Sequence, residues 1–345
     1  MEKQIFTTFP ADGGARLGDL CLKLIEDQKK TWPALAAAYV GLAGIKTKAH
    51  CCGGYEVRVQ FNPARSVSSG AAVDPRSIKN RPCFLCTRNL PAEQKGILYH
   101  EEYLILCNPA PIFEKHFTVV HRQHQPQAIA ASIGSLLDLA ADMSPDFVVF
   151  YNGPACGASA PDHLHFQAIP AGILPLPEAF PEGFRIISDS GVQVYRAENS
   201  DRAILVLDGN DKELLLKQFA CLMKAARNVV AGSEEPMINL LCSYANGVWR
   251  IMIFFRAKHR PDAFFLEGEQ RIFVSPGTID MAGVIITPRE KNFNRLDGQR
   301  IRNIYAEVSL PEEVVNKIVE QGVATTHAGG KTPCSMRTMR TIPEA

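Results

Sequence analysis

A short stretch of strict alternation constrains this chain more than any other feature of its sequence. Residues 163–168 read His-Leu-His-Phe-Gln-Ala, so three polar side chains, His163, His165 and Gln167, alternate with apolar ones. Because successive side chains of a β-strand point to opposite faces, the stretch predicts a strand with one apolar face and one face that carries two imidazoles and a carboxamide. The apolar face needs a core to pack against, and the polar face can meet a ligand.

A turn-rich segment precedes this strand. It contains Gly153, Gly157 and Ser159, and such small residues let backbone N–H groups approach a bound anion closely. Phosphate is the natural ligand for imidazoles beside a cradle of this kind. The alternative is a polar edge strand whose histidines face solvent.

These residues resemble a known active-site signature, that of the histidine triad superfamily. The resemblance is carried by Asn152, Gly157, Ala158, Ser159, His163, His165 and Gln167. It is to the branch that holds galactose-1-phosphate uridylyltransferase, diadenosine tetraphosphate phosphorylase and GDP-L-galactose phosphorylase, which has glutamine where the hydrolase branch has a third histidine. The resemblance implies an α+β fold, with a histidine triad-like antiparallel sheet and flanking helices, duplicated into two similar halves.

The resemblance also implies catalytic roles. The second histidine of the signature, His165, is the nucleophile, and its Nδ1–H is held by the backbone carbonyl of His163. A neutral imidazole can attack phosphorus and leave a phosphoramidate that is easily transferred onward. We expect Gln167 to donate to a nonbridging phosphate oxygen, Ser159 and the backbone around Gly157 to stabilise the developing charge, and Asn152 to position the leaving side.

A carboxamide at position 167 cannot titrate, so the site lacks a third imidazole that could act on water. We therefore expect transfer to a phosphate-bearing acceptor rather than hydrolysis. The predicted enzyme is a nucleotidylyltransferase or phosphorylase that cleaves a pyrophosphate-bridged nucleotide, either a sugar nucleotide or a dinucleoside polyphosphate, with phosphate or a sugar phosphate as acceptor. The alternatives are a histidine triad-type nucleotide hydrolase and a non-enzymatic nucleotide-binding sensor.

A metal site is a further expectation. Cys83 and Cys86 form a C-x-x-C pair, which by itself fits a redox pair or two packed thiols equally well. In the resembling family such a pair holds a structural zinc together with a histidine after a later strand and the first histidine of the signature. The resemblance thus implies zinc on Cys83, Cys86, His124 and His163, with His121 as a substitute for His124. No organic cofactor is implied.

Basic residues cluster in the polar segment 64–81, which includes Arg65 and Arg81. A solvated surface loop and a phosphate contact are both open readings of this segment. Family members often place basic residues ahead of the cysteine pair, which favours a phosphate contact.

The resemblance assigns further substrate contacts. It places Asn108 near the ribose and an apolar side chain, Ile112 or Phe113, near the base, although core packing is the stronger expectation for Phe113. It also makes Lys258 and His259, at a predicted strand end, candidates for phosphate contacts. A solvated turn is the alternative for this pair.

Hydrophobic periodicity predicts the order of the elements. We expect helices over 14–32, 33–43, 127–143, 211–230 and 311–321, and strands over 55–61, 103–108, 116–121, 147–151, 237–243, 248–255 and 281–287. The Asn246-Gly247 pair is a strong hairpin signal, and residues 171–204 read as loop-rich. The expected domains are an N-terminal helical segment (1–50), a catalytic half (51–175), a second α+β half (176–324) and a flexible tail (325–345).

The overall charge limits the partners. The net charge of +1 over 345 residues excludes strong whole-chain attraction to nucleic acid or to an anionic membrane, so phosphate binding must be local. The sequence shows no export-signal pattern and no apolar run of the about 18 residues that a membrane span needs. Its 10 cysteines are too sparse for a small disulfide scaffold. We expect a cytoplasmic monomer or homodimer.

Overall fold

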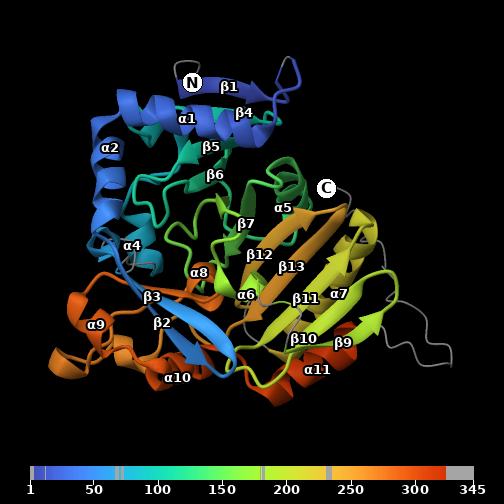
Figure 1. Ribbon diagram of the computed structural model, residues 1–345. Coiled ribbons are helices and arrows are strands. Elements are labelled where there is room, and N and C mark those ends of the chain that lie inside the picture. The colour runs from blue at the N-terminus through green and yellow to red at the C-terminus, as the bar shows by residue number, and fades with distance from the viewer. Residues whose placement is uncertain are drawn as a thin grey trace, which may run out of the picture.

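Alternating apolar residues build one large sheet that runs through both parts of the chain. The computed structural model describes residues 4–11, 13–66, 70, 74–178, 180, 183–230 and 235–323. Its 11-stranded sheet has the order β1-β4-β5-β6-β8-β7-β12-β13-β11-β10-β9, from the top of Figure 1 to its lower right. Neighbouring strands are antiparallel except for the parallel pair β1–β4.

The strands of this sheet are short to medium in length. Those of the first part are β1 (Ile5–Phe9), β4 (Gly96–Tyr99), β5 (Tyr103–Cys107), β6 (Phe117–His121), β7 (Phe147–Asn152) and β8 (His165–Pro170). Those of the second part are β9 (Phe184–Asp189), β10 (Gln193–Ala197), β11 (Ile204–Gly209), β12 (Ile238–Ala245) and β13 (Val248–Phe255). A second sheet has the order β14-β3-β2 and consists of β2 (Lys46–Cys52), β3 (Tyr55–Phe61) and β14 (Val284–Thr287).

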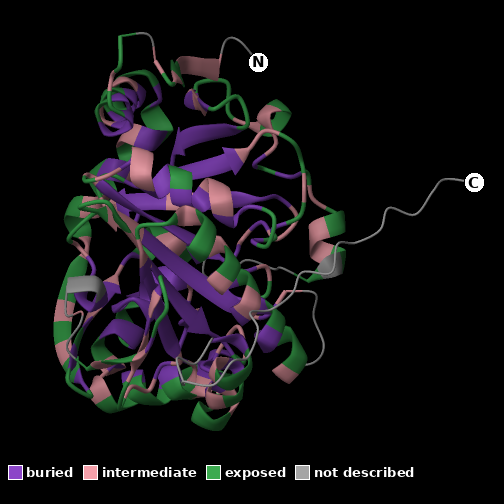
Figure 2. Ribbon diagram, turned by 90° about the vertical axis from the view of Figure 1, so that its right-hand side faces the viewer, coloured by how far each residue is buried: buried purple, intermediate pink, exposed green. Residues whose placement is uncertain are grey.

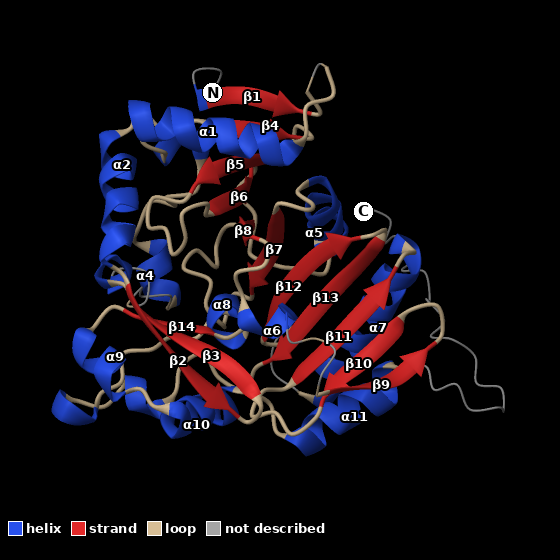
Figure 3. Cartoon of the chain, viewed as in Figure 1, coloured by secondary structure: helices blue, strands red, loops and turns tan. Residues whose placement is uncertain are grey.

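Helices surround the sheets, as Figure 3 shows. The longer ones are α1 (Leu17–Thr31), α2 (Pro33–Val40), α5 (Ile133–Asp142), α7 (Lys212–Val229), α10 (Gly298–Val308) and α11 (Glu312–Gly322). The shorter ones are α4 (Pro75–Lys79), α6 (Pro175–Glu178), α8 (Thr278–Met281) and α9 (Glu290–Arg295). None of the helices in the described part of the chain combines the length and apolar composition that crossing a bilayer requires.

The two faces of the large sheet pack against different partners. Val149 and Tyr151 of β7 point into a core with α1, α5, α7 and α11, whereas Val148 and Phe150 point into a core with the small sheet, α8 and α10. Figure 2 shows that the strands of the sheet are largely buried, with exposed residues on the outer helices. The strand alternation therefore divides the interior into two cores.

The predicted fold class is confirmed: the protein has a mainly antiparallel sheet with flanking helices. The strand predicted over 55–61 is β3. The turn predicted at Asn246-Gly247 has φ values of 53° and 79°, which is the left-handed geometry of a tight hairpin.

Several boundaries differ from the prediction. The helix expected over 127–143 begins at Ile133 as α5, because the N–H of Gln127 bonds to Pro161 O and the N–H of Ile129 bonds to the Glu235 carboxylate. The predicted loop 171–204 contains β9 and β10, which form the half-exposed edge of the sheet around Gly191. The triad strand, expected from residue 163, is β8 and starts at His165.

The two parts of the chain are joined through both sheets. β7 pairs with β12 from Asn152 opposite Asn239 to Val149 opposite Cys242, and β3 pairs with β14. The predicted domain boundaries stay predictions, and β2 begins at Lys46, before the expected start of the catalytic half. The tail predicted over 325–345 lies outside the described residues.

Candidate active site

A cavity of about 770 Å³ opens where β5, β6, β7 and β8 meet loops of the second part. Its volume lies within the range of about 300–1,000 Å³ that small-molecule sites occupy. Nine of the residues predicted for substrate or catalysis line it: Arg65, Asn108, Asn152, Gly157, Ala158, Ser159, His165, Gln167 and His259. His163, which lies behind His165, does not line the cavity, and neither do Lys258 and Phe113.

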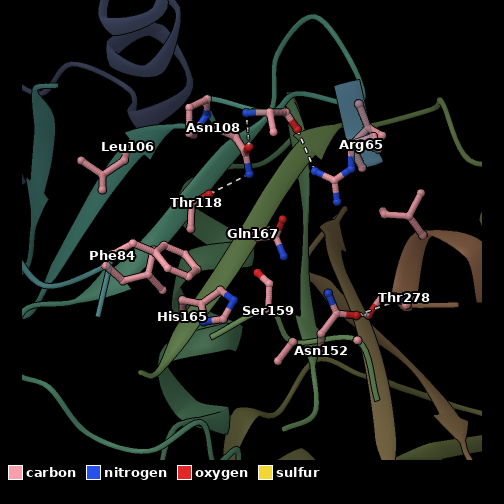
Figure 4. Close-up of a pocket in the computed structure, with 18 of the residues that line it drawn as sticks. Arg65, Phe84, Leu106, Asn108, Thr118, Asn152, Ser159, His165, Gln167 and Thr278 are labelled. Atoms are coloured by element: carbon pink, nitrogen blue, oxygen red, sulfur yellow. Dashed lines mark hydrogen bonds between the residues drawn. The ribbon is translucent and has the colours of Figure 1, made fainter. Parts of the chain in front are cut away.

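His165 is the first residue of β8 and is 4% exposed. Its Nδ1–H donates to the carbonyl of His163 at 2.8 Å, which leaves Nε2 without a proton in the neutral ring. Burial lowers the pKa of His165 to about 4, although the bond to His163 acts in the opposite direction. Figure 4 shows the imidazole turned toward Ser159, so an unprotonated ring nitrogen faces the cavity.

Gln127 clamps the backbone on which His165 stands. Its Nε2 donates to His165 O at 3.0 Å and to Asn152 O at 2.9 Å, while its Oε1 accepts from His165 N at 2.8 Å. The carboxamide is 2% exposed and so takes the place of a strand neighbour where β7 and β8 diverge. It fixes His165 and Asn152 relative to each other.

Gln167 projects from β8 on the same side as His165, as the alternation predicts. Thr118 of β6 and Phe150 of β7 lie opposite it in the two neighbouring strands. Its Oε1 lies 2.9 Å from Nε2 of the buried His116. Figure 4 shows its nitrogen on the side of Ser159, toward the centre of the cavity.

The loop between β7 and β8 supplies the small residues. Gly157 has φ of 109°, a conformation that disfavours side chains, and a Cβ there would lie 3.0 Å from the backbone of Gly277 and 3.2 Å from Asn152 Oδ1. Glycine is therefore required both by the turn and by the close approach of the second part of the chain. Ser159 points from the same loop to the space between His165 and Gln167 (Figure 4).

Asn152 ends β7 and is held by the second part of the chain. Its Oδ1 accepts from Asn239 Nδ2 at 3.0 Å and from Thr278 N at 2.8 Å, with the Thr278 hydroxyl at 2.9 Å. Asn239 is fixed in turn by the buried Arg256, whose Nη1 donates to Asn239 Oδ1 at 2.5 Å. Because its oxygen is occupied, Asn152 presents its NH₂ group to the cavity, as Figure 4 shows.

Four potential metal ligands lie beside the start of β8. The ligand atoms of Cys83, Cys86, His124 and His163 all fall within 4.8 Å of one another. Cys83 Sγ is 3.2 Å and Cys86 Sγ is 3.6 Å from His163 Nδ1, and Cys86 Sγ is 3.3 Å from His124 Nδ1. Ligands on a tetrahedron around zinc, with bonds of about 2.0–2.3 Å, are separated by about 3.3–3.8 Å, so the cluster fits a metal ion of this kind.

The hydrogen bonds of His163 agree with such a site. Its Nε2–H donates to the carbonyl of His121 at 2.7 Å, which leaves Nδ1 unprotonated toward the cysteines. Its own carbonyl accepts from His165. His121, the predicted substitute for His124, contributes this carbonyl instead of its ring.

The two candidate arginines of the segment 64–81, Arg65 and Arg81, both line the cavity. Arg65 Nη1 donates to Ala110 O at 2.8 Å, and Arg81 Nη2 donates to Asp162 Oδ1 at 2.8 Å. The buried atoms Arg65 Nε and Arg81 Nη1 have no hydrogen-bond partner among the described residues. Each guanidinium can therefore still donate to an anion.

Only some of the residues predicted to contact the ribose and the base line the cavity. Asn108 lines the cavity, but its Nδ2 donates to Thr118 Oγ1 at 2.9 Å and its Oδ1 accepts from Ala110 N at 2.9 Å. Ile112 also lines the cavity, whereas Phe113 packs against the core and does not. Sequence reasoning missed Phe84, an aromatic residue that lines the cavity, lies between the two cysteines in the sequence and is 47% exposed.

Of the two strand-end candidates, Lys258 and His259, one lines the cavity and the other does not. His259 lines the cavity, and its Nε2 lies 3.2 Å from Ser275 Oγ. The same hydroxyl oxygen accepts from Arg260 Nε at 2.9 Å. Lys258 is outside the lining and forms ion pairs with Asp262 at 2.7 Å and Glu307 at 2.5 Å. The position of Lys258 therefore does not support a phosphate contact, whereas Arg260, two residues further along the chain, lines the cavity.

No local pattern points to the other residues that were missed. Gln127, His116, Asn239 and Thr278 are scattered in the chain and belong to no spacing pattern. They share burial of a polar side chain, which only the structure reveals.

Each of the two parts of the chain matches a known protein-family model. Residues 24–170 match the family model of a domain of unknown function (DUF4922), and residues 178–328 match the model described as the GDPGP1-like C-terminal domain. No curated protein sequence matches the chain.

Two crystal structures of yeast Ap4A phosphorylase Apa2 are similar to this protein. The complex with AMP is 17% identical, covers 84% of this chain and 96% of its own, and has a TM-score of 0.57. The complex with Ap4A is 16% identical, covers 86% of this chain and 99% of its own, and has a TM-score of 0.58. The likeness extends over both parts of the chain and establishes a shared fold.

Proposed function

We propose that this chain is a nucleotidyltransferase of the phosphorylase and uridylyltransferase branch of the histidine triad-like superfamily. Its match to the GDPGP1-like C-terminal domain model and its likeness in fold to Ap4A phosphorylase support this proposal. The enzyme cleaves a pyrophosphate-bridged nucleotide, either a sugar nucleotide or a dinucleoside polyphosphate, and passes the nucleotidyl group to phosphate or a sugar phosphate. One observation carries the proposal: His165 directs an unprotonated Nε2 into a cavity that the amides of Gln167 and Asn152 face with their NH₂ groups.

The reaction has two balanced steps. In the first, His165 Nε2 attacks the α-phosphorus, a P–N bond forms, and the bridging P–O bond breaks as the phosphate-bearing leaving group departs. The ring becomes an imidazolium whose Nδ1–H is held by the carbonyl of His163. In the second, a phosphate oxygen of the acceptor attacks, the P–N bond breaks, and the neutral ring returns.

The charge that develops on the transferred phosphoryl group meets preorganised donors. The NH₂ groups of Gln167 and Asn152 and the hydroxyl of Ser159 border the space in front of His165 (Figure 4). Such donors are worth most where water is excluded, because the local dielectric is low. We assign these three residues to the nonbridging and leaving oxygens.

The cavity also suggests how the substrate is oriented. Figure 4 shows Phe84 and Leu106 on one side of His165, and Arg65 on the other. We assign the base to the apolar side, where Phe84 can stack on it. The leaving group and the acceptor phosphate then lie toward Arg65, with His259 and Arg260 of the second part also lining the cavity.

A zinc ion, if held by Cys83, Cys86, His124 and His163, would have a structural role. All four positions are protein ligands, which closes a tetrahedral site and leaves no place for substrate. Its contribution to the reaction is to fix the ring and hence the carbonyl of His163 against His165. No step of the chemistry passes through the metal.

A screen with intact-protein mass tests the proposal. Nucleoside diphosphate sugars and dinucleoside polyphosphates are added with and without orthophosphate, and we expect one of them to add a nucleoside monophosphate to the chain. Orthophosphate should discharge the adduct as a nucleoside diphosphate. His165→Asn, which keeps the size and polarity of the side chain, should form no adduct.

The other outcomes are equally distinct. Turnover that does not depend on orthophosphate and releases a nucleoside monophosphate indicates a hydrolase. Binding without adduct or turnover indicates a sensor, and adduct formation by the His165→Asn variant would refute the assigned nucleophile.

A further inference from the structure

His116 lies directly behind the site and takes no part in the reaction proposed above. It precedes β6, is 0% exposed, and its ring lies roughly parallel to that of Phe150, with centroids 6.2 Å apart. Among the described residues, the N–H of Ile112 and Oε1 of Gln167 are the polar groups within 3.3 Å of its ring nitrogens. A buried imidazole with one backbone partner and one active-site partner connects the scaffold to the site.

The protonation state of this ring follows from its neighbours. Burial, and then the charge of Arg65, lower the pKa of His116 to about 3, so the ring is neutral at pH 7. The N–H of Ile112 donates to Nδ1 at 3.3 Å, and a proton on Nδ1 would face that donor. The single ring proton is therefore on Nε2.

The proton on Nε2 decides how Gln167 is turned. Nε2 lies 2.9 Å from Gln167 Oε1, so the imidazole donates and the amide oxygen accepts. The NH₂ group of Gln167 is then directed away from His116, which agrees with its nitrogen lying toward Ser159 in Figure 4. Asn108 Nδ2 lies farther away, 3.4 Å from the same ring nitrogen, and donates to Thr118 Oγ1 at 2.9 Å.

We propose that His116 is a positioning residue that locks the Gln167 carboxamide in the orientation that presents its NH₂ group to the transferred phosphoryl group. A carboxamide has a donor end and an acceptor end of nearly equal size. If it rotated by half a turn, its oxygen would face the phosphate oxygens, and a stabilising hydrogen bond would become a repulsion. The benefit of this orientation rests on the proposed function, but the tautomer of His116 does not.

Substitutions that keep or remove the donor test this assignment. His116→Gln places an amide nitrogen near the position of Nε2 and should keep adduct formation within a few-fold of the wild type. His116→Met has similar bulk but no donor, and we expect the rate of adduct formation to fall by about 10- to 100-fold, the effect of losing one hydrogen bond to a charged group. Gln167→Ala is the reference for complete loss of that donor.

The double variant separates positioning from general support of the fold. If His116 acts through Gln167, then His116→Met combined with Gln167→Ala should be no slower than Gln167→Ala alone. Multiplying rate losses would overturn the inference. So would a His116→Gln variant as slow as His116→Met although its thermal midpoint equals that of the wild type.

The tautomer can be measured without any substrate. Long-range ¹H–¹⁵N spectra of histidine-labelled protein at pH 7 should show His116 protonated on Nε2 and unprotonated on Nδ1. The opposite tautomer overturns the inference even in an inactive protein. A wild type without adduct, tested against every candidate nucleotide, would instead count against the proposed function, so the two failures are distinguishable.

Discussion

At the scale of single residues, each of the main side chains of the site uses one polar atom in a hydrogen bond within the protein. The Nδ1–H of His165 is taken by a carbonyl, Oε1 of Gln167 by an imidazole, and Oδ1 of Asn152 by an amide of the second part. What remains facing the cavity is one lone pair and two NH₂ groups. The chemistry of each residue is thus set by its buried partner as much as by its type.

The depressed pKa of His116 has a consequence for stability. Burial lowers this pKa to about 3, whereas a histidine in an unfolded chain has a pKa of about 6.5. Between these two pH values the unfolded state binds a proton that the folded state does not. The contribution of the neutral His116 ring to the unfolding free energy is therefore fully present above the unfolded pKa and is lost as the pH falls. On lowering the pH from 7 to 5, the wild type should lose about 2 kcal/mol more unfolding free energy than His116→Gln.

Denaturant unfolding of both proteins at each pH measures this difference. The neutral glutamine serves as the matched control, because the other titrating groups are common to both chains. Parallel curves for the two proteins would contradict the burial of a neutral imidazole at position 116.

At the scale of elements, the first residue of β8 is held from three directions. Gln127 clamps its backbone, β6 pairs with it through Val120, and the carbonyl of His163 fixes its ring. His163 itself lies among Cys83 and Cys86 of a distant loop. A strand end that would otherwise fray becomes a fixed platform for the nucleophile.

Metal content is the prediction at this scale. We expect about one zinc ion per chain, because four nitrogen and sulfur ligands in a closed tetrahedral arrangement favour it. Cys86→Ser should lose most of the metal and lower the thermal midpoint, whereas Cys51→Ser, at an exposed cysteine outside the cluster, should do neither. Elemental analysis and thermal unfolding measure both effects, and a purified protein that binds no zinc at all would rule the site out.

At the scale of the whole molecule, the second part of the chain completes the site. Asn152 belongs to the first part, but the groups that turn its amide, Asn239 and the backbone and hydroxyl of Thr278, belong to the second. Gly157 lies against Gly277 across the same boundary. The large sheet holds both sides in register through β7 and β12.

The Thr278 hydroxyl offers a test of this dependence. Thr278→Val removes a group within reach of both Tyr151 O and Asn152 Oδ1 and leaves a buried acceptor less well satisfied. We expect the rate of adduct formation to fall by about tenfold, corresponding to about 1.4 kcal/mol. Thr278→Ser keeps the hydroxyl and should retain most of the rate.

Thr287→Val is the matched control for this substitution. Thr287 is also 0% exposed and its hydroxyl also donates to a backbone carbonyl, that of Phe273, but it has no bond to Asn152. The Thr287→Val variant should have a lower unfolding free energy than the wild type but the same rate of adduct formation. Equal slowing by both valine variants would show that the loss at 278 reflects general destabilisation.

Local patterns determined those parts of the fold that depend on side-chain period. Alternation placed His165 and Gln167 on one face and packed Phe166 and Ala168 into the core behind them. The Asn246-Gly247 turn followed from the φ values that these residues tolerate. The start of α5 was missed because the N–H of Ile129 bonds to Glu235, over 100 residues away, and no local rule contains that partner.

The sequence by itself therefore determined which side chains the triad strand presents, that the chain has an α+β fold with a mainly antiparallel sheet, and which cysteines and histidines were candidates for a metal. Only the tertiary structure decided which way each of these groups points. It placed His116 behind Gln167, Thr278 behind Asn152, and Lys258 in ion pairs outside the cavity. The reason is physical: a side chain's identity and strand face are local properties, whereas the hydrogen-bond partner of a buried polar atom comes from whichever distant segment packs against it.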